Sequence, residues 1–174
     1  ALVRARAEEW GIDPDKIFVC GFSAGGHLAA SLGVLWDRTF VAESLGRAAD
    51  DVRPNGMILG YPAISATQFI DTESIENVLL GNDTEETRAL VSLEKQVTAD
   101  TPPAFIWHTA ADDNVAVENS LMFACALRAH GVPFALHIVP EGNHGLSLAQ
   151  AETGMVEEQL NDWPAWCAAW IRSR

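Results

Sequence analysis

The segment 21–25 (GFSAG) has the residue types and spacing of a serine nucleophile held in a tight turn. A serine hydroxyl is a weak nucleophile and must project freely toward a base and a substrate. A sharp strand-to-helix turn would expose Ser23, and Gly21 and Gly25 would leave the space that this turn requires. The N–H of Ala24 would then point at a developing oxyanion. A glycine-rich turn with an incidental serine is the alternative, but the strand before it and the helix after it favour the nucleophile.

Five histidines compete for the role of the base that a serine nucleophile needs. His144 lies in the loop 140–145 (PEGNHG), directly after a predicted strand, where open α/β sheets place their catalytic groups. The other four have simpler structural explanations in helix packing, at a solvated helix end or inside strands (His27, His130, His108 and His137). We therefore predict His144 as the base.

The carboxylate that orients this base is expected in the loop after the preceding strand, where Asp112 and Asp113 are adjacent. Either aspartate could instead form a turn or cap the next helix, and position alone does not choose between them. The order serine, aspartate, histidine is that of α/β-hydrolases and differs from the two other well-known triad orders. Each of the three residues follows a separate predicted strand, which predicts one site at a shared sheet edge.

The elements that must position these residues alternate between short apolar strands and helices, which predicts βα units and a parallel sheet. Strands are predicted at 16–20, 56–60, 104–108 and 134–139. Helices are predicted at 2–10, 24–36, 74–80, 84–93, 117–130 and 163–172, and Asp83 and Glu86 resemble a capping box before the fourth of them. The last helix carries one apolar stripe at helical spacing, expected to face the core (Trp163, Trp166, Cys167, Trp170 and Ile171).

Composition and charge disfavour several classes of protein. The 174 residues carry 24 acidic and 11 basic side chains, a net charge of −13, so nucleic acid is not an expected partner. No apolar run approaches the roughly 20 residues of a membrane span. The amphipathic start, ALVRARAEEW, is not a signal peptide, so we expect a cytoplasmic protein. Three scattered cysteines predict no disulfide framework or zinc cluster, and each is expected as a small buried residue (Cys20, Cys125 and Cys167).

Five segments resemble α/β-hydrolase esterases of the bacterial acetyl-esterase and hormone-sensitive-lipase-like type, which includes acetyl xylan esterases. They are 11–30, 58–65, 79–98, 101–121 and 131–148. In this family the triad aspartate stands three residues before a valine, which is Val115 here, so the resemblance implies Asp112 with Asp113 in reserve. Ser23 and His144 match the nucleophile and the base, while Ala116 replaces the usual proline.

The resemblance implies an α/β-hydrolase fold, a parallel sheet flanked by helices, in one domain over 1–174 with a small cap-like insertion at 65–98. This chain departs from the family because it contains no His-Gly-Gly-Gly loop to complete the oxyanion hole, and the usual first strands are missing. We therefore expect the C-terminal portion of a longer protein. Strand 16–20 would present an unpaired apolar edge, to be covered by a preceding segment or by a second copy in a homo-oligomer.

The expected function is hydrolysis of a small-molecule carboxylic ester by acyl transfer through Ser23, without a metal or an organic cofactor. The resemblance implies short acyl groups, acetyl foremost, on a sugar or a xylan-derived oligosaccharide. Two alternatives stay open. One is a peptidase or amidase of the prolyl-oligopeptidase type, which also uses G-x-S-x-G-G. The other is a catalytically weak portion that serves as a binding domain.

Overall fold

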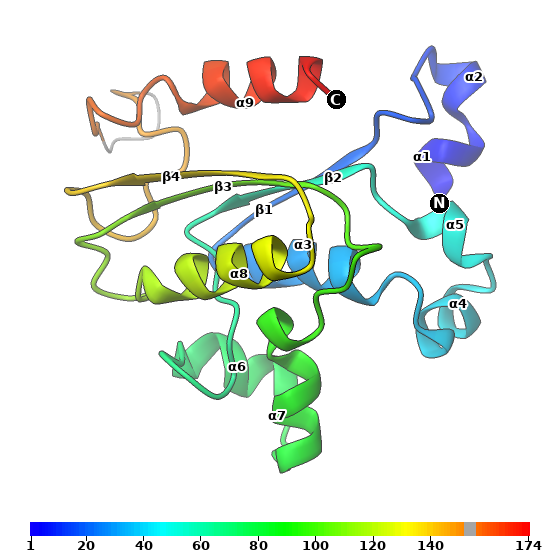
Figure 1. Cartoon of the computed structure of the whole chain (residues 1–174), viewed down its shortest axis with the longest axis horizontal. Helices are drawn as coiled ribbons and strands as arrows, with labels where there is room; N and C mark the ends of the chain where they lie inside the picture. Colours follow the sequence, from blue (N-terminus) through cyan, green and yellow to red (C-terminus); the bar gives the residue numbers. More distant parts are fainter. Residues whose placement is uncertain (152–155) are drawn as a thin grey trace.

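The computed structural model describes residues 1–151 and 156–174, which form a parallel sheet with helices on both faces (Figure 1). The strand order is β1-β2-β3-β4, so each strand lies beside the one that precedes it in the chain. The strands are β1 (Phe18–Phe22), β2 (Gly56–Gly60), β3 (Ala104–Thr109) and β4 (Phe134–Val139). Because all pairs are parallel, the carboxyl ends of the strands meet at one edge of the sheet.

The helices occupy two layers and one end of the sheet (Figure 1). One face is covered by α9 and the other by α3 and α8, with α6 and α7 lying beyond α3 and α8. The bounds are α1 (Leu2–Ala5), α2 (Ala7–Trp10), α3 (Ala24–Leu35), α4 (Thr39–Leu45), α5 (Ala49–Val52), α6 (Thr72–Leu79), α7 (Glu85–Val91), η1 (Leu93–Lys95), α8 (Glu118–Ala129) and α9 (Trp163–Arg172). None of the helices in the described part of the chain is both long and apolar enough to cross a membrane.

The first strand lies two residues later than predicted. The N–H of Lys16 donates to the carbonyl of Asp13 in a turn, and the N–H of Ile17 donates to the Asn55 side chain, so neither residue joins the ladder. The strand continues instead to Phe22, which lies opposite Gly60 on β2. The interior strands β2 and β3 are buried at every position, as expected for strands covered on both faces.

Two more local predictions are corrected. The predicted helix 2–10 is interrupted at Arg6, which lies between α1 and α2. The cap of α7 is Thr84, whose hydroxyl accepts the N–H of Thr87 while the Thr87 hydroxyl accepts the N–H of Thr84. Asp83 pairs instead with the Arg88 guanidinium, at 2.5 Å between Oδ1 and Nε.

The core consists of two apolar layers, one on each face of the sheet. The layer under α9 holds Trp163, Cys167 and Trp170 as buried residues, with Trp166 and Ile171 packed against it, so the predicted stripe does face the core. The opposite layer brings α3 close to β2, since a Cβ built on Gly33 would lie 2.1 Å from the Met57 sulfur.

The strand β1 is one of the two outer strands of the sheet that the described residues form, the other being β4, and the outer side of β1 is largely apolar. A cavity of about 320 Å³ borders β1 and α3 there, and Leu28 beside it is 73% exposed (lining: Val19, Cys20, Gly25, Leu28, Ala29 and Leu32). Cys20 is exposed because it lies on this strand, and Cys125 is exposed on α8. The prediction that all three cysteines are buried therefore holds only for Cys167.

Candidate active site

Ser23 occupies a strained backbone position between β1 and α3. Its φ of 55° and ψ of −125° are unusual for a residue with a side chain. Four backbone hydrogen bonds hold it there: its N–H donates to the carbonyl of Gly60, and its carbonyl accepts the N–H groups of Gly26, His27 and Ala63. The surrounding backbone therefore fixes the direction in which the hydroxyl leaves the chain.

Two glycines make this turn sterically allowed, and one of them was not predicted. A Cβ built on Gly21 would lie 2.0 Å from the carbonyl oxygen of Gly25, and one on Gly26 would lie 2.7 Å from the Cβ of Pro62. A Cβ on Gly25 would meet nothing within 4 Å, so the prediction that Gly25 supplies room is wrong. The crowding at Gly26 is set by Pro62, which follows β2 and is remote in sequence, whereas the crowding at Gly21 comes from the turn itself.

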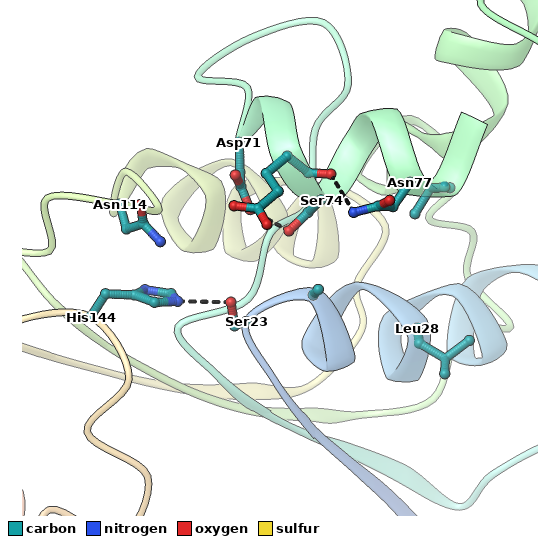
Figure 2. A pocket seen from close by; sticks show the side chains of 10 residues that line it. Ser23, Leu28, Asp71, Ser74, Asn77, Asn114 and His144 are labelled. Carbon is teal, nitrogen blue, oxygen red and sulfur yellow. Dashed lines mark hydrogen bonds between the residues drawn. The ribbon is translucent and has the colours of Figure 1, made fainter. Parts of the chain in front are cut away.

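The structure brings Ser23, His144 and Asp112 together at the carboxyl edge of the sheet. The Ser23 Oγ lies 2.7 Å from the Nε2 of His144. Figure 2 shows the two side chains pointing toward one another. The Nδ1 of the same ring lies 2.8 Å from Oδ2 and 3.1 Å from Oδ1 of Asp112. A ring that donates from Nδ1 to the carboxylate accepts the serine proton at Nε2, which is the geometry of general base catalysis.

Asp112, and not Asp113, contacts the imidazole. The Asp112 side chain is 1% exposed, whereas Asp113 is an exposed residue. The Oδ1 of Asp112 also accepts the backbone N–H groups of Asn114 and Val115, at 3.0 and 2.9 Å. The turn-forming role and the contact with His144 are therefore combined in one side chain.

The hydrogen bonds around Asp112 keep it ionised. Burial by itself would raise the pKa of this carboxyl. Hydrogen bonds from His108, His144 and the N–H groups of Val115 and Asn114 outweigh the burial and hold the pKa of Asp112 far below its ordinary range. A carboxylate in this state can stabilise a positive charge on the neighbouring His144 ring.

Tyr61 and Thr109 support the loop that carries His144. The Tyr61 ring packs edge-on against the imidazole, with 4.9 Å between centroids, and its hydroxyl accepts the N–H of Ser147. The Thr109 hydroxyl donates to the carbonyl of Gly142 at 2.7 Å. Sequence reasoning missed both residues, although each stands at or just after the carboxyl end of a strand, where such a role could have been sought.

The other histidines lie outside the pair formed with Ser23. The Nε2 of His27 donates to the carbonyl of Val91, and His137 stacks on Trp166 with 5.1 Å between centroids. His130 is exposed at the end of α8. His108 is fully buried, as its strand position predicts, but its Nε2 also lies 3.3 Å from Oδ2 of Asp112.

A cavity of about 550 Å³ opens over Ser23 and His144. One wall is the start of α3, including Ala24, and the other is α6, which lies across from Ser23 (Figure 2). The full lining is Ser23, Ala24, Leu28, Asp71, Glu73, Ser74, Asn77, Val78, Asn114 and His144. The volume suits a small molecule, and the α6 wall is polar and acidic.

The first N–H groups of a helix have no acceptor within the helix, so the Ala24 N–H can face this cavity as a donor. Across residues 1–151 and 156–174, no group of three or more histidine, cysteine or acidic side chains is placed to hold a metal ion. Sequence reasoning did not find the α6 residues of the cavity, because exposed polar side chains on a short helix carry no sign of what lies opposite them.

The parallel sheet with helices on both faces and a serine at the β1–α3 turn defines the class as the α/β-hydrolase fold, which the sequence predicted. The sequence model of the BD-FAE family, a family of α/β-hydrolase esterases, matches residues 1–127, and the chain belongs to that family. The matched range includes Ser23 and Asp112 but ends before His144.

The names of two relatives refer to xylan or acetylxylan. The chain is 43% identical over 152 residues to endo-1,4-beta-xylanase B of Butyrivibrio fibrisolvens. The matched region covers 87% of this chain and 24% of that protein. It is 32% identical over 150 residues to the acetylxylan esterase of Xylanibacter ruminicola, covering 83% of this chain and 28% of that protein. The chain therefore spans about a quarter of the length of these relatives.

Solved structures agree in fold over nearly the whole chain. An acetyl ester-xyloside bifunctional hydrolase from Caldicellulosiruptor lactoaceticus superposes with a TM-score of 0.85 at 39% identity, covering 99% of this chain and 61% of that one. The carboxylesterase Cest-2923 from Lactobacillus plantarum superposes with a TM-score of 0.84 at 29% identity, covering 99% and 63%.

Proposed function

We propose that this chain carries the catalytic triad of a serine carboxylic-ester hydrolase, with Ser23 as nucleophile, His144 as base and Asp112 as the acid that orients it. In this proposal the turn at 21–26 is a nucleophile elbow. The observation that carries the proposal is the continuous line of hydrogen bonds from the Ser23 hydroxyl through the His144 ring to the buried Asp112 carboxylate.

The reaction follows from the positions of the protons. As Ser23 Oγ attacks the ester carbonyl carbon, its proton passes to Nε2 of His144, and Asp112 stabilises the resulting imidazolium. The imidazolium then returns the proton to the leaving alcohol, which leaves the acyl group on Ser23. A water molecule, deprotonated by the same ring, releases the acid and restores the serine.

The tetrahedral intermediate carries a negative oxygen, which we propose is bound by the N–H of Ala24 at the start of α3. A further donor is needed, since removing one donor from an oxyanion hole lowers turnover by about 10²–10³. In this proposal the further donor is supplied by the element that covers the apolar outer side of β1, either a preceding segment of a longer protein or a second copy of the chain.

For the substrate, we propose a short acyl ester, acetyl foremost, of a sugar or a xylan-derived oligosaccharide. The names of two relatives, an acetylxylan esterase and an acetyl ester-xyloside bifunctional hydrolase, support an acetylated carbohydrate. The polar α6 wall suits an alcohol group rich in hydroxyls. The net charge of −13 disfavours anionic esters.

The test is the reactivity of Ser23. A fluorophosphonate probe should label the native chain at Ser23 and leave the Ser23→Ala variant unlabelled, and the same variant should lose hydrolysis of p-nitrophenyl acetate. Hydrolysis that persists in Ser23→Ala would exclude Ser23 as the nucleophile and with it the proposed mechanism. Absence of labelling in well-folded native chain would favour a binding domain that does not catalyse.

A peptidase or amidase is the second candidate, since the chain is 26% identical over 97% of its length to a probable dipeptidyl-aminopeptidase B of Arthroderma otae. The same triad can cleave an amide, but the amine leaving group depends more strongly on protonation by His144. Comparing p-nitrophenyl acetate with dipeptide p-nitroanilides separates the two. Faster turnover of the anilides would overturn the esterase assignment.

A further inference from the structure

We propose that His108 is a positioning residue of the triad: a neutral imidazole whose N–H holds the Asp112 carboxylate toward His144. This inference rests on the proposed function, because it assigns a partner to the acid of that same triad. His108 stands in β3, four residues before Asp112, and its side chain is fully buried.

Three contacts fix the His108 ring. Its Nδ1 lies 2.8 Å from the Ser120 hydroxyl on α8, and its Nε2 lies 2.9 Å from the carbonyl of Val115. The same Nε2 lies 3.3 Å from Oδ2 of Asp112. The ring therefore ties β3 and α8 to the loop that carries the acid.

The partners determine which nitrogen of His108 carries the proton. The carbonyl of Val115 can only accept a hydrogen bond, so Nε2 must donate one. The Nδ1 of a neutral ring then accepts a hydrogen bond from the Ser120 hydroxyl. The Nε2 N–H donates to the Val115 carbonyl, and Oδ2 of Asp112 lies 3.3 Å from the same nitrogen. A neutral His108 thus serves as an N–H donor toward the acid without adding a charge.

The Asp112 carboxylate is held on both oxygens. Oδ2 lies between the rings of His108 and His144, and Oδ1 accepts the backbone N–H groups of Asn114 and Val115. Rotation of the carboxylate would break contacts on both sides, so its orientation toward His144 is fixed before substrate binds. The N–H dipole of His108 also partly offsets the negative charge on Oδ2, which would otherwise act on His144 alone.

Titratable groups reach Asp112 from three directions. They are His108 on β3, His144 on the loop after β4 and the Tyr61 phenol after β2, whose pKa is raised by burial and by the Asp112 charge. Removing the His108 donor leaves more charge at Oδ2, which holds the proton on a His144 imidazolium more tightly. The acid limb of the pH profile should then move to higher pH.

The experiment compares two substitutions by the rate at which fluorophosphonate labels Ser23 as a function of pH. His108→Phe removes the donor, and labelling should slow about 10- to 100-fold with the acid limb moved to higher pH. His108→Gln places an amide N–H near the position of Nε2 and should recover most of the rate and the native limb. His137→Phe is the matched control, since its ring stacks on Trp166 away from the triad, and both readouts should stay native.

Ser120→Ala covers the case in which His108→Phe does not fold. This variant removes the hydroxyl that donates to Nδ1 and helps to hold the His108 ring in place, so labelling should slow less than in His108→Phe and the acid limb of the pH profile should move in the same direction. If folded His108→Phe keeps the native labelling rate and the native acid limb of the pH profile, the inference is overturned. The same result in Ser120→Ala overturns it where His108→Phe does not fold. Equal loss in His108→Gln and His108→Phe with an unmoved limb would overturn it too, because that pattern marks a packing role.

A readout that does not use reactivity separates this inference from the proposed function. The titration of His144, followed by ¹H–¹⁵N NMR in Ser23→Ala and in Ser23→Ala with His108→Phe, should shift to higher pH when the donor is removed. A native chain that labels poorly while this shift is present contradicts the esterase proposal and leaves the Asp112–His108 contact supported. Normal labelling without the shift contradicts the His108 inference alone.

Discussion

The two walls of the cavity are held in place very differently. The wall formed by the Ser23 turn and the His144 loop rests on hydrogen bonds, with Asp112 alone accepting from the His144 ring and two backbone N–H groups and lying 3.3 Å from the His108 ring. The α6 wall presents exposed side chains such as Glu73 and Asn77 and is anchored to a small apolar cluster through Ile75 and Leu79. In the proposed reaction the groups that move protons require fixed distances, whereas the α6 side chains that would contact the alcohol group of the ester can be replaced by other residues.

The largest effect is expected from Asp112→Asn. An amide cannot hold the His144 ring with its proton on Nδ1, and loss of the triad acid lowers kcat by about 10⁴-fold in serine hydrolases. Steady-state hydrolysis of p-nitrophenyl acetate measures this. Asp113→Asn is the neighbouring control and should remain within about twofold of native. Equal losses in the two variants would show that the rigid wall is not organised around Asp112.

Next in size is the effect of a methyl group in the Ser23 turn. Gly21→Ala would drive its Cβ into the Gly25 carbonyl, and the free energy of unfolding should fall by about 3 kcal/mol. Gly25→Ala meets open space in a helix and should change stability by less than about 1 kcal/mol. Urea unfolding compares the pair. A Gly21→Ala variant as stable as Gly25→Ala would contradict the tight turn.

Asn119 connects the two walls, and its removal should act on both stability and substrate affinity. Its buried amide accepts the N–H groups of Ile64 and Ser65 and donates to the carbonyls of Phe69 and Ala116. Asn119→Ala leaves these groups without partners, which should lower stability by about 2 kcal/mol and loosen the segment that leads to α6.

The kinetic signature of Asn119→Ala should be a rise in KM that exceeds the fall in kcat, because Ser23 and His144 keep their own supports. Asn82→Ala, at an exposed asparagine after α6, is the control and should leave both constants near native. A fall in kcat with unchanged KM would show that the α6 wall and the triad are coupled more tightly than the contacts indicate.

The smallest effect is expected at the α6 wall itself. Glu73→Gln removes one exposed negative charge from the cavity lining, so the rate with an anionic acetyl ester should rise about two- to fivefold relative to a neutral one. Glu85→Gln, on α7 outside the cavity lining, should leave that ratio unchanged. A ratio unaffected by Glu73→Gln would show that this carboxylate does not face the bound ester.

Much of the fold follows from local patterns. The strands 56–60 and 134–139 and the helix 163–172 have the predicted bounds, because each is a clear apolar run or stripe between turn residues. The short helices α4 and α5 were not predicted, and neither has a side-chain cap that would mark its start. The displaced start of β1 depends on Asn55, a contact 38 residues away that no local pattern contains.

The candidate site, like the fold, was predicted only in part. The positions of Ser23, His144 and the aspartate pair after predicted strands indicated a shared site, since parallel strands bring their carboxyl ends to one edge. The α6 lining and the second contact of His108 were missed. His108 lies in β3 but Asp112 lies in the turn beyond the end of that strand, so the alternation of side chains along a strand does not extend to Asp112 and does not predict this contact.

The exposed thiol of Cys20 makes the outer side of β1 accessible to a simple chemical assay. A maleimide reacts with an accessible thiol and is blocked when a neighbouring strand or another copy lies over it. Cys125, exposed on α8, which packs against β3 and β4, offers an internal reference in the same molecule. Mass spectrometry at several protein concentrations would give the ratio of modification at Cys20 to that at Cys125. Equal modification would mean that β1 is solvated, and low modification of Cys20 at every concentration would mean that its own polypeptide shields it. Shielding that disappears on dilution would indicate a reversible dimer.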